Sequence, residues 1–274
     1  MRINDKEDGL THRMPAHILG WDPSQCGVCP YDDVTSIAIM YRTEMERLRA
    51  LIPEEFEVTQ PTIAIVYQKC NGVQWMGGAG YSLVAVSTPV RYLEAGDPLE
   101  GMFHHVLWED KAAPILGGRE EAGMPKVWAD IPEYRRMNGN LSVNVSHEGR
   151  TFLEVELAEV RPFTPAEIAG MNENHGRLVQ FGWRYIPKIG PFPGAALSEA
   201  TYYPVDNEYA SGSVCTGSVA WTALKPEQHP MQFAVIGALA SLPVLEYLAG
   251  SIKRGRSWMR MDLARSLPQV IGHD

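Results

Sequence analysis

Short apolar runs rich in β-branched and aromatic residues recur along the chain, and turn signals separate many of them. Asn71-Gly72 and Gly77-Gly78 are two such signals, and Asn138-Gly139 precedes an alternating hairpin pattern. Closely spaced short strands with few helices predict an α+β, mostly β fold. They favour one antiparallel sheet that is curled or closed. The runs that predict strands are 34–41, 56–67, 81–90, 103–108, 141–157, 178–186, 200–203 and 211–221.

Three segments predict outer helices, and one segment predicts an arm. Thr43, with Glu46 three residues later, predicts the start of a helix that Pro53 ends. Thr164-Pro165-Ala166-Glu167 is typical of a helix start and predicts a short helix that ends near Met171. A tract rich in Leu, Ile and Met over residues 242–261 predicts a C-terminal helix. Residues 1–33 contain recurrent prolines and glycines, which predict an irregular N-terminal arm. No linker divides residues 34–274, so we expect them to form a single domain.

The composition excludes several classes of function. Of the 274 residues, 45% are hydrophobic and 21% are charged, and the formal charge is −9. This is the balance of an ordinary globular protein, and its acidic sign argues against nucleic acid or an anionic membrane as a partner. No apolar run reaches the roughly 18 residues that a membrane-spanning helix needs. The first residues are polar and charged, without the apolar core of a signal peptide, so we expect a cytoplasmic protein.

The four cysteines include one Cys-x-x-Cys pair, Cys26 and Cys29. A structural zinc site takes about four ligands, and His12 and His17 lie upstream without the expected spacing. We interpret the pair as reduced thiols in the arm, with metal binding or redox chemistry as the alternative. The glycine loops of nucleotide sites, the nucleophile elbow and the His-Glu-x-x-His motif do not occur. We therefore expect no metal and no cofactor.

Residues 117–130 form a glycine-punctuated stretch that we read as a loop running into a short strand. Pro125 suits the first position of a strand, which places Lys126 at the strand mouth. Alternation along the strand puts Lys126, Trp128 and Asp130 on one face and Val127 with its neighbour Ala129 on the other. An apolar setting disfavours the ammonium form, and a neutral amine attacks ketones to form a Schiff base. The alternative is a lysine that extends to solvent at a strand end.

Four motifs in order resemble the acetoacetate decarboxylase family. Gly118-Arg119-Glu120, followed by a spacer and Pro125-Lys126, resembles its active-site segment. The stretch from Tyr41-Arg42-Thr43 to Ile52-Pro53-Glu54, the Tyr185-Ile186-Pro187 segment and Leu242-Pro243-Val244 resemble three further family segments, between about residues 34 and 265. The resemblance implies a strongly curved, barrel-like sheet with helices outside and the lysine facing inward. It also implies lyase activity and a homo-oligomer.

The sequence departs from the family at most positions that surround the lysine. The second family lysine, next to the nucleophile, is replaced by Val127, with Pro125 on the other side. One family glutamate corresponds to Val66, and the other falls near Gly80 or Tyr81. A family arginine corresponds to Val34. A pocket adapted to a larger, less charged carbonyl substrate is one interpretation, and a relative that binds without catalysis is the other.

Several residues remain as candidates beside Lys126. Arg119 and Glu120, the family's Arg-Glu pair, are the other candidate catalytic residues, with an ion pair that braces the loop as the alternative. Histidines 104 and 105 are adjacent on a strand, so we expect only one of them to face the pocket. We expect the carboxylates of residues 120 and 121 at the pocket rim, at least one of them held by Arg119. The candidate substrate-binding residues are Tyr81, Glu121, Trp75, Met76, Trp128 and His105.

The sequence thus predicts a lysine Schiff-base lyase that acts on a keto acid or ketone. Decarboxylation, aldol condensation and dehydration all fit the chemistry of the imine. The alternative is a non-catalytic protein that binds small apolar or carbonyl compounds. With Val127 in place of the second lysine, we expect burial alone to activate Lys126, and we expect Val127→Lys to shift the pH profile of imine formation downward.

Overall fold

The computed structural model describes residues 10–16, 20–21, 27–93 and 98–268. Most of this described part is strand, as the sequence predicts, and within it four α-helices and three short 3-10 helices accompany the strands. The helices are α1 Met45–Arg49, α2 Ala112–Ala122, α3 Pro165–Met171, α4 Phe233–Ala240, η2 Gln74–Met76, η3 Glu173–Gly176 and η4 Met261–Leu263. The strands are β1 Thr11–His12, β2 Gly20–Trp21, β3 Cys29–Arg42, β4 Phe56–Val58, β5 Thr62–Val73, β6 Tyr81–Tyr92, β7 Leu99–Glu109, β8 Lys126–Trp128, β9 Arg135–Met137, β10 Asn140–His147, β11 Arg150–Pro162, β12 Leu178–Pro187, β13 Ala195–Trp221, β14 Glu246–Met259 and β15 Arg265–Ser266.

The large sheet has 13 strands and closes on itself. Strand β12 pairs with β7 on one side and with β13 on the other, so that β12, β7, β6, β5, β3, β14 and β13 form a ring. Strand β13 is 27 residues long, and its first part pairs with β12 while its last part pairs with β11. The barrel-like sheet is therefore confirmed. Two pairings, β12 with β7 and β7 with β8, are parallel within this otherwise antiparallel sheet.

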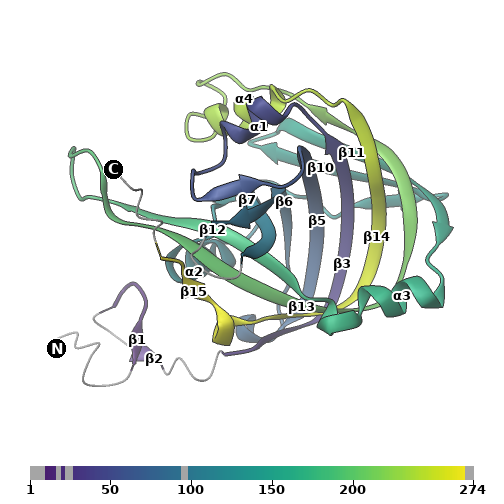
Figure 1. The fold of residues 1–274 in the computed structure, drawn as a ribbon, viewed down its shortest axis with the longest axis horizontal. Helices are drawn as coiled ribbons and strands as arrows, with labels where there is room; N and C mark the ends of the chain where they lie inside the picture. Colours follow the sequence, from purple (N-terminus) through teal and green to yellow (C-terminus); the bar gives the residue numbers. More distant parts are fainter. Residues whose placement is uncertain (1–9, 17–19, 22–26, 94–97, 269–274) are drawn as a thin grey trace.

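The helices lie outside the sheet. Figure 1 shows α1 and α4 together at one end of the ring and α3 at the other end. The predicted helix after Thr164 is confirmed as α3, which begins with Pro165 and has a capping box between Thr164 and Glu167. None of the helices among the described residues is long and apolar enough to cross a membrane.

Two sequence predictions of element boundaries are wrong. Residues 242–261, predicted as a helix, contain the whole of strand β14, which pairs with β3 and β13. The helix in this region is α4, which ends at Ala240. The N-terminal arm is shorter than the predicted 1–33, because residues 29–33 already belong to β3. The small β1–β2 hairpin lies before it, apart from the ring (Figure 1).

Apolar side chains fill two regions. The main core contains Trp108, Phe152 and Phe181, all fully buried, together with side chains from α1 and α4. A separate group, here called the second cluster, comprises Cys29, Tyr31, Val34, Cys70, Val73, Tyr81, Leu83, Ala85, Leu107, Ala122, Met124 and Tyr203.

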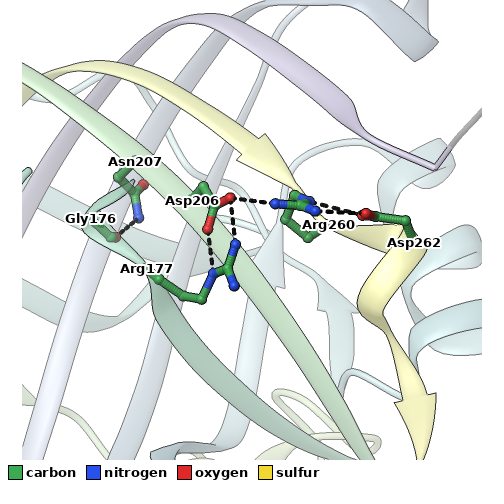
Figure 2. A network of polar contacts seen from close by, with 6 residues as sticks. All are labelled: Gly176, Arg177, Asp206, Asn207, Arg260 and Asp262. Carbon is green, nitrogen blue, oxygen red and sulfur yellow. Dashed lines mark hydrogen bonds and ion pairs between the residues drawn. The ribbon is translucent and has the colours of Figure 1, made fainter. Parts of the chain in front are cut away.

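An ionic network holds two segments to strand β13 (Figure 2). One segment follows η3, and the other follows β14. Asp206 on β13 accepts two hydrogen bonds from Arg177, at 2.7 and 2.9 Å, and one from Arg260 at 2.8 Å. Arg260 also binds Asp262 through two nitrogens. The Arg177 guanidinium lowers the pKa of the Asp206 carboxyl, so this carboxylate stays ionised and paired near neutral pH.

Candidate active site

The stretch before Lys126 is a helix and not the predicted loop. Helix α2 runs through both glycines, Gly117 and Gly118, and ends at Gly123, which has a left-handed φ of 66°. Glycine is favoured at this C-terminal position because it lacks the Cβ that strains left-handed backbone. Gly118 has a packing role, since a Cβ added there would lie 2.3 Å from Cδ of Lys126. Helix α2 therefore lies directly against the lysine side chain.

Lys126 is the first residue of β8, as the sequence predicts, and it is 8% exposed. Its Nζ lies 2.8 Å from Oε1 of Glu109 and donates a hydrogen bond to the backbone oxygen of Pro114 at 3.2 Å. Strand β8 pairs in parallel with β7, with Lys126 opposite Leu107. Glu109 comes two residues after Leu107, so alternation brings it to the same face as the lysine.

Glu109 is a candidate site residue that the sequence did not reveal. Its side chain is fully buried, and burial raises the pKa of its carboxyl, while the neighbouring lysine opposes part of that rise. Glu120 and Glu121, whose carboxylates were expected at the pocket rim, are nearer to Lys126 along the chain. The available signal was the Trp108-Glu109-Asp110 segment at the end of an apolar run, where a charged residue directly follows a buried tryptophan.

The residues of α2 have other partners than those predicted. Arg119 donates from Nη1 to the backbone oxygen of Lys126 at 3.0 Å, so it fixes the lysine backbone. Glu121 is held by Arg13 of the N-terminal arm, with Nη2 donating to Oε2 at 2.8 Å. Glu120 is partly exposed on the same helix. The prediction that Arg119 holds one of these carboxylates is therefore wrong, and the arm supplies that cation.

Three predicted wall residues gather at the second cluster. Tyr81 is 2% exposed, and its hydroxyl lies 3.3 Å from that of Tyr31. Trp75 donates from its indole nitrogen to Tyr31 at 3.2 Å, and Met76 packs against the same cluster. Burial raises the pKa of both tyrosine hydroxyls, which keeps them protonated as hydrogen-bond donors.

The second cluster lies within electrostatic reach of the lysine–glutamate pair. Burial raises the pKa of the Cys70 thiol to about 12; the Glu109 charge adds to the rise and the Lys126 charge opposes it. Val34, at the position of the family arginine, lies opposite Cys70 across the β3–β5 pairing. The face beside Lys126 thus combines tyrosine hydroxyls, a thiol and aliphatic side chains.

Val127 and Trp128 point away from this cluster. Val127 packs against the main core, as does Ala129, which confirms the predicted alternation. A lysine at position 127 would therefore enter the main core, and the expectation that Val127→Lys tunes Lys126 is revised to one of destabilisation. Trp128 is 43% exposed and lines an open groove of about 520 Å³ with Asp110 and Asp130. The structure does not bring Trp128 into the second cluster.

The sequence predicts that only one of the two adjacent histidines faces the pocket, but the strand alternation behind this prediction is interrupted here. The β6–β7 register shifts between Val86 and Ser87, so that Val86 pairs with Val106 and Ser87 pairs with His104. His105 is the extra residue in this β-bulge, and a bulge re-aims the side chains on either side of it. His104 and His105 both line one cavity of about 310 Å³.

The described residues contain no cluster of three or more His, Cys, Asp or Glu side chains that could hold a metal ion. Cys70 and Cys215 are free and buried, and Cys29 is buried as well. The predicted Cys-x-x-Cys pair cannot be completed here, because Cys26 lies outside the described residues.

A closed, curved sheet with a buried lysine at the start of a short parallel strand defines a class of protein, the acetoacetate decarboxylase fold. The family described as Acetoacetate decarboxylase (ADC) matches residues 13–265 of this chain. The chain belongs to the acetoacetate decarboxylase family.

Named relatives and solved structures agree with this assignment. Acetoacetate decarboxylase of Burkholderia cenocepacia is 32% identical over 217 residues, 77% of each chain. Acetoacetate decarboxylase 1 of Bradyrhizobium diazoefficiens is 36% identical over 88 residues, 32% of this chain and 33% of that relative. The structure of acetoacetate decarboxylase from Legionella pneumophila superposes with a TM-score of 0.73 at 16% identity and 90% coverage of both chains. The structure of the enduracididine biosynthesis enzyme MppR complexed with pyruvate superposes with a TM-score of 0.65 at 17% identity, and the match covers 88% of this chain and 90% of that one.

Proposed function

We propose that the chain is a lysine-dependent lyase that forms a Schiff base between Lys126 and a keto acid or ketone. The observation that carries the proposal is the 2.8 Å contact between Nζ of Lys126 and a fully buried carboxylate, Glu109. Membership of a family named for a decarboxylase supports the reaction class. Decarboxylation is the first reaction that we propose, and aldol condensation or dehydration through the same imine is the second.

Glu109 has the properties of a proton acceptor for the lysine. The raised pKa of its carboxyl makes it a better acceptor for the ammonium proton than an exposed glutamate would be. The resulting amine attacks the keto carbon, and the carbinolamine formed loses its hydroxyl as water when Glu109 returns the proton. The protonated imine then accepts the electron pair of the C–C bond as carbon dioxide leaves. Protonation of the enamine carbon and hydrolysis of the imine by water release the ketone and the free lysine.

The side chains of the second cluster favour a substrate that carries little charge besides the carboxylate that it loses. Val34 and Val66 stand where the family has an arginine and a glutamate, and Val34 belongs to the second cluster. An apolar environment disfavours a carboxylate, so it favours conversion of that carboxylate into neutral carbon dioxide. The hydroxyls of Tyr31 and Tyr81 are the polar groups on this face that we propose to orient the substrate oxygen.

Reductive trapping tests the proposal. The protein is incubated with acetoacetate, pyruvate or cyclohexanone, treated with borohydride, and analysed by peptide mass spectrometry. We expect a mass increase on the peptide that contains Lys126, and none in Lys126→Arg, because a guanidinium stays protonated and cannot attack. Lys188→Arg, at an exposed lysine, serves as the matched control and keeps the adduct. Binding of these compounds without any adduct would contradict the lyase and favour a non-catalytic binding protein.

We also infer a cytoplasmic homo-oligomer without nucleic-acid or membrane partners. The loop between β12 and β13 carries Ile189, which is 98% exposed, and Phe192, which is 68% exposed. Burial of these side chains against a second copy of the chain would remove a large apolar surface from water.

A further inference from the structure

Lys126 is not among the residues that line the cavity of about 310 Å³ beside the two histidines, although its charge acts on His104. The walls of the cavity come from the end of α1, from α4 and from β12, and include Leu51, Trp183, Val235 and Leu239. This volume lies at the lower end of the range typical of small-molecule pockets, about 300 to 1,000 Å³. Figure 1 shows α1 and α4 near each other at one end of the ring.

The two histidines of the cavity differ in their hydrogen bonding, since one ring nitrogen of His105 has a partner within the protein. Nε2 of His105 lies 2.8 Å from the hydroxyl of Thr88. His104 is 5% exposed, and among the described residues neither of its ring nitrogens has a hydrogen-bond partner in good geometry. Gln180 comes close enough to favour the protonated ring, but burial outweighs it. A buried polar group without a partner is destabilising, and a ligand with a matching group relieves that cost.

The charges of the side chains that line the cavity indicate which class of ligand it can bind. Among the residues that the structure describes, no lysine, arginine, aspartate or glutamate lines it. Burial lowers the pKa of both histidines to about 4, so both rings are neutral near pH 7. A neutral imidazole offers one donor and one acceptor, whereas a buried anion needs a cation that the cavity lacks.

We propose that this cavity is a second small-molecule site, which binds an uncharged, mostly apolar compound through a hydrogen bond between His104 and a single carbonyl or hydroxyl group. The site is distinct from the imine-forming one. The Lys126 amine contacts Glu109 and Pro114, and Gly118 lies against its side chain, whereas the cavity is lined by the preceding residue, Pro125.

Calorimetric titration of the full chain tests this site with cyclohexanone, cyclohexanol and cyclohexanecarboxylate at pH 7. We expect the ketone and the alcohol to bind and the carboxylate to bind at least tenfold more weakly. His104→Phe should weaken binding of the alcohol at least tenfold, while His104→Gln, which keeps a donor and an acceptor, should retain most of it. Ala238→Phe, which fills the cavity from α4, should abolish binding and leave reductive trapping at Lys126 intact.

Lys126→Met separates this proposal from the proposed lyase. We expect cyclohexanol to bind Lys126→Met as it binds the unmodified chain, whether or not Lys126 proves to form an imine. Loss of binding in Lys126→Met, or unchanged binding in a folded Ala238→Phe variant, would overturn the second site. Circular dichroism in the near ultraviolet establishes that each variant keeps its packed core.

Discussion

The pairing of Lys126 with Glu109 makes a quantitative prediction about stability. Glu109→Gln removes the carboxylate and leaves a buried ammonium, which costs about 3–5 kcal/mol when one partner of a buried pair is lost. Lys126→Met leaves a carboxylate that can take up a proton, because the pKa of Glu109 is already raised, so its cost is smaller. The double variant removes both charges, and its free energy of unfolding should lie within about 1 kcal/mol of that of the unmodified chain.

A double-mutant cycle measured by urea unfolding at pH 7 gives the coupling energy of the pair. We expect a coupling of about 2–4 kcal/mol, since the double variant avoids the cost of an uncompensated buried charge. The pair Arg42–Glu246 is the control, because its atoms lie 3.0 Å apart but both side chains are about half exposed. Exposed pairs couple by about 0–1 kcal/mol. A coupling for Lys126 and Glu109 no larger than that of the control would refute the buried ion pair and the mechanism built on it.

Three further results are expected. Gly118→Ala should reduce imine trapping at least tenfold, because its Cβ would displace the Lys126 side chain, whereas Gly117→Ala, which meets no atom closer than 3.9 Å, should leave trapping unchanged. Asp206→Asn should lower the free energy of unfolding, measured in urea at pH 6, by about 1.5–3 kcal/mol. Asp262→Asn, at the exposed end of the same network, should lower it by less than about 1 kcal/mol. The lowered pKa of the Asp206 carboxyl gives stability that is fully present above its unfolded pKa, about 4, and is lost as the pH falls from there through the lower folded pKa, so the deficit of Asp206→Asn should shrink towards pH 3. Light scattering should show an oligomer that Phe192→Asp shifts towards the monomer; a monomer in the unmodified chain would contradict self-association.

The strands could be predicted from the sequence because their apolar runs are locally distinct. The C-terminal tract could not, because Leu, Ile and Met suit both helix and strand, and residues 246–259 become a strand through pairing with β3 and β13. Helix α2 was missed for a related reason. Its glycines weaken a helix by about 1 kcal/mol each relative to alanine, and the reason for Gly118, contact with Lys126, is visible only in three dimensions.

At the site, the lysine could be predicted and its partner could not. Pro125 and the family motif mark Lys126 in the sequence itself. Glu109 lies 17 positions earlier, and its contact depends on the parallel register between β7 and β8, which a single sequence does not specify. The bulge at His105 is a similar case, because one extra residue in β7 redirects two side chains without any glycine to signal it.

The position of β3 between β5 and β14 has a consequence for biosynthesis. Its pairing with β14 joins residues that are about 200 positions apart, such as Arg42 and Glu246. The ribosome must therefore release almost the whole chain before this part of the ring can form, and pairing across such separations slows folding. Tyr31 on β3 donates to the sulfur of Met259 on β14, so the second cluster is incomplete until then. We expect nascent chains that end before β14 to expose the edge of β3, which makes them candidates for chaperone binding and aggregation.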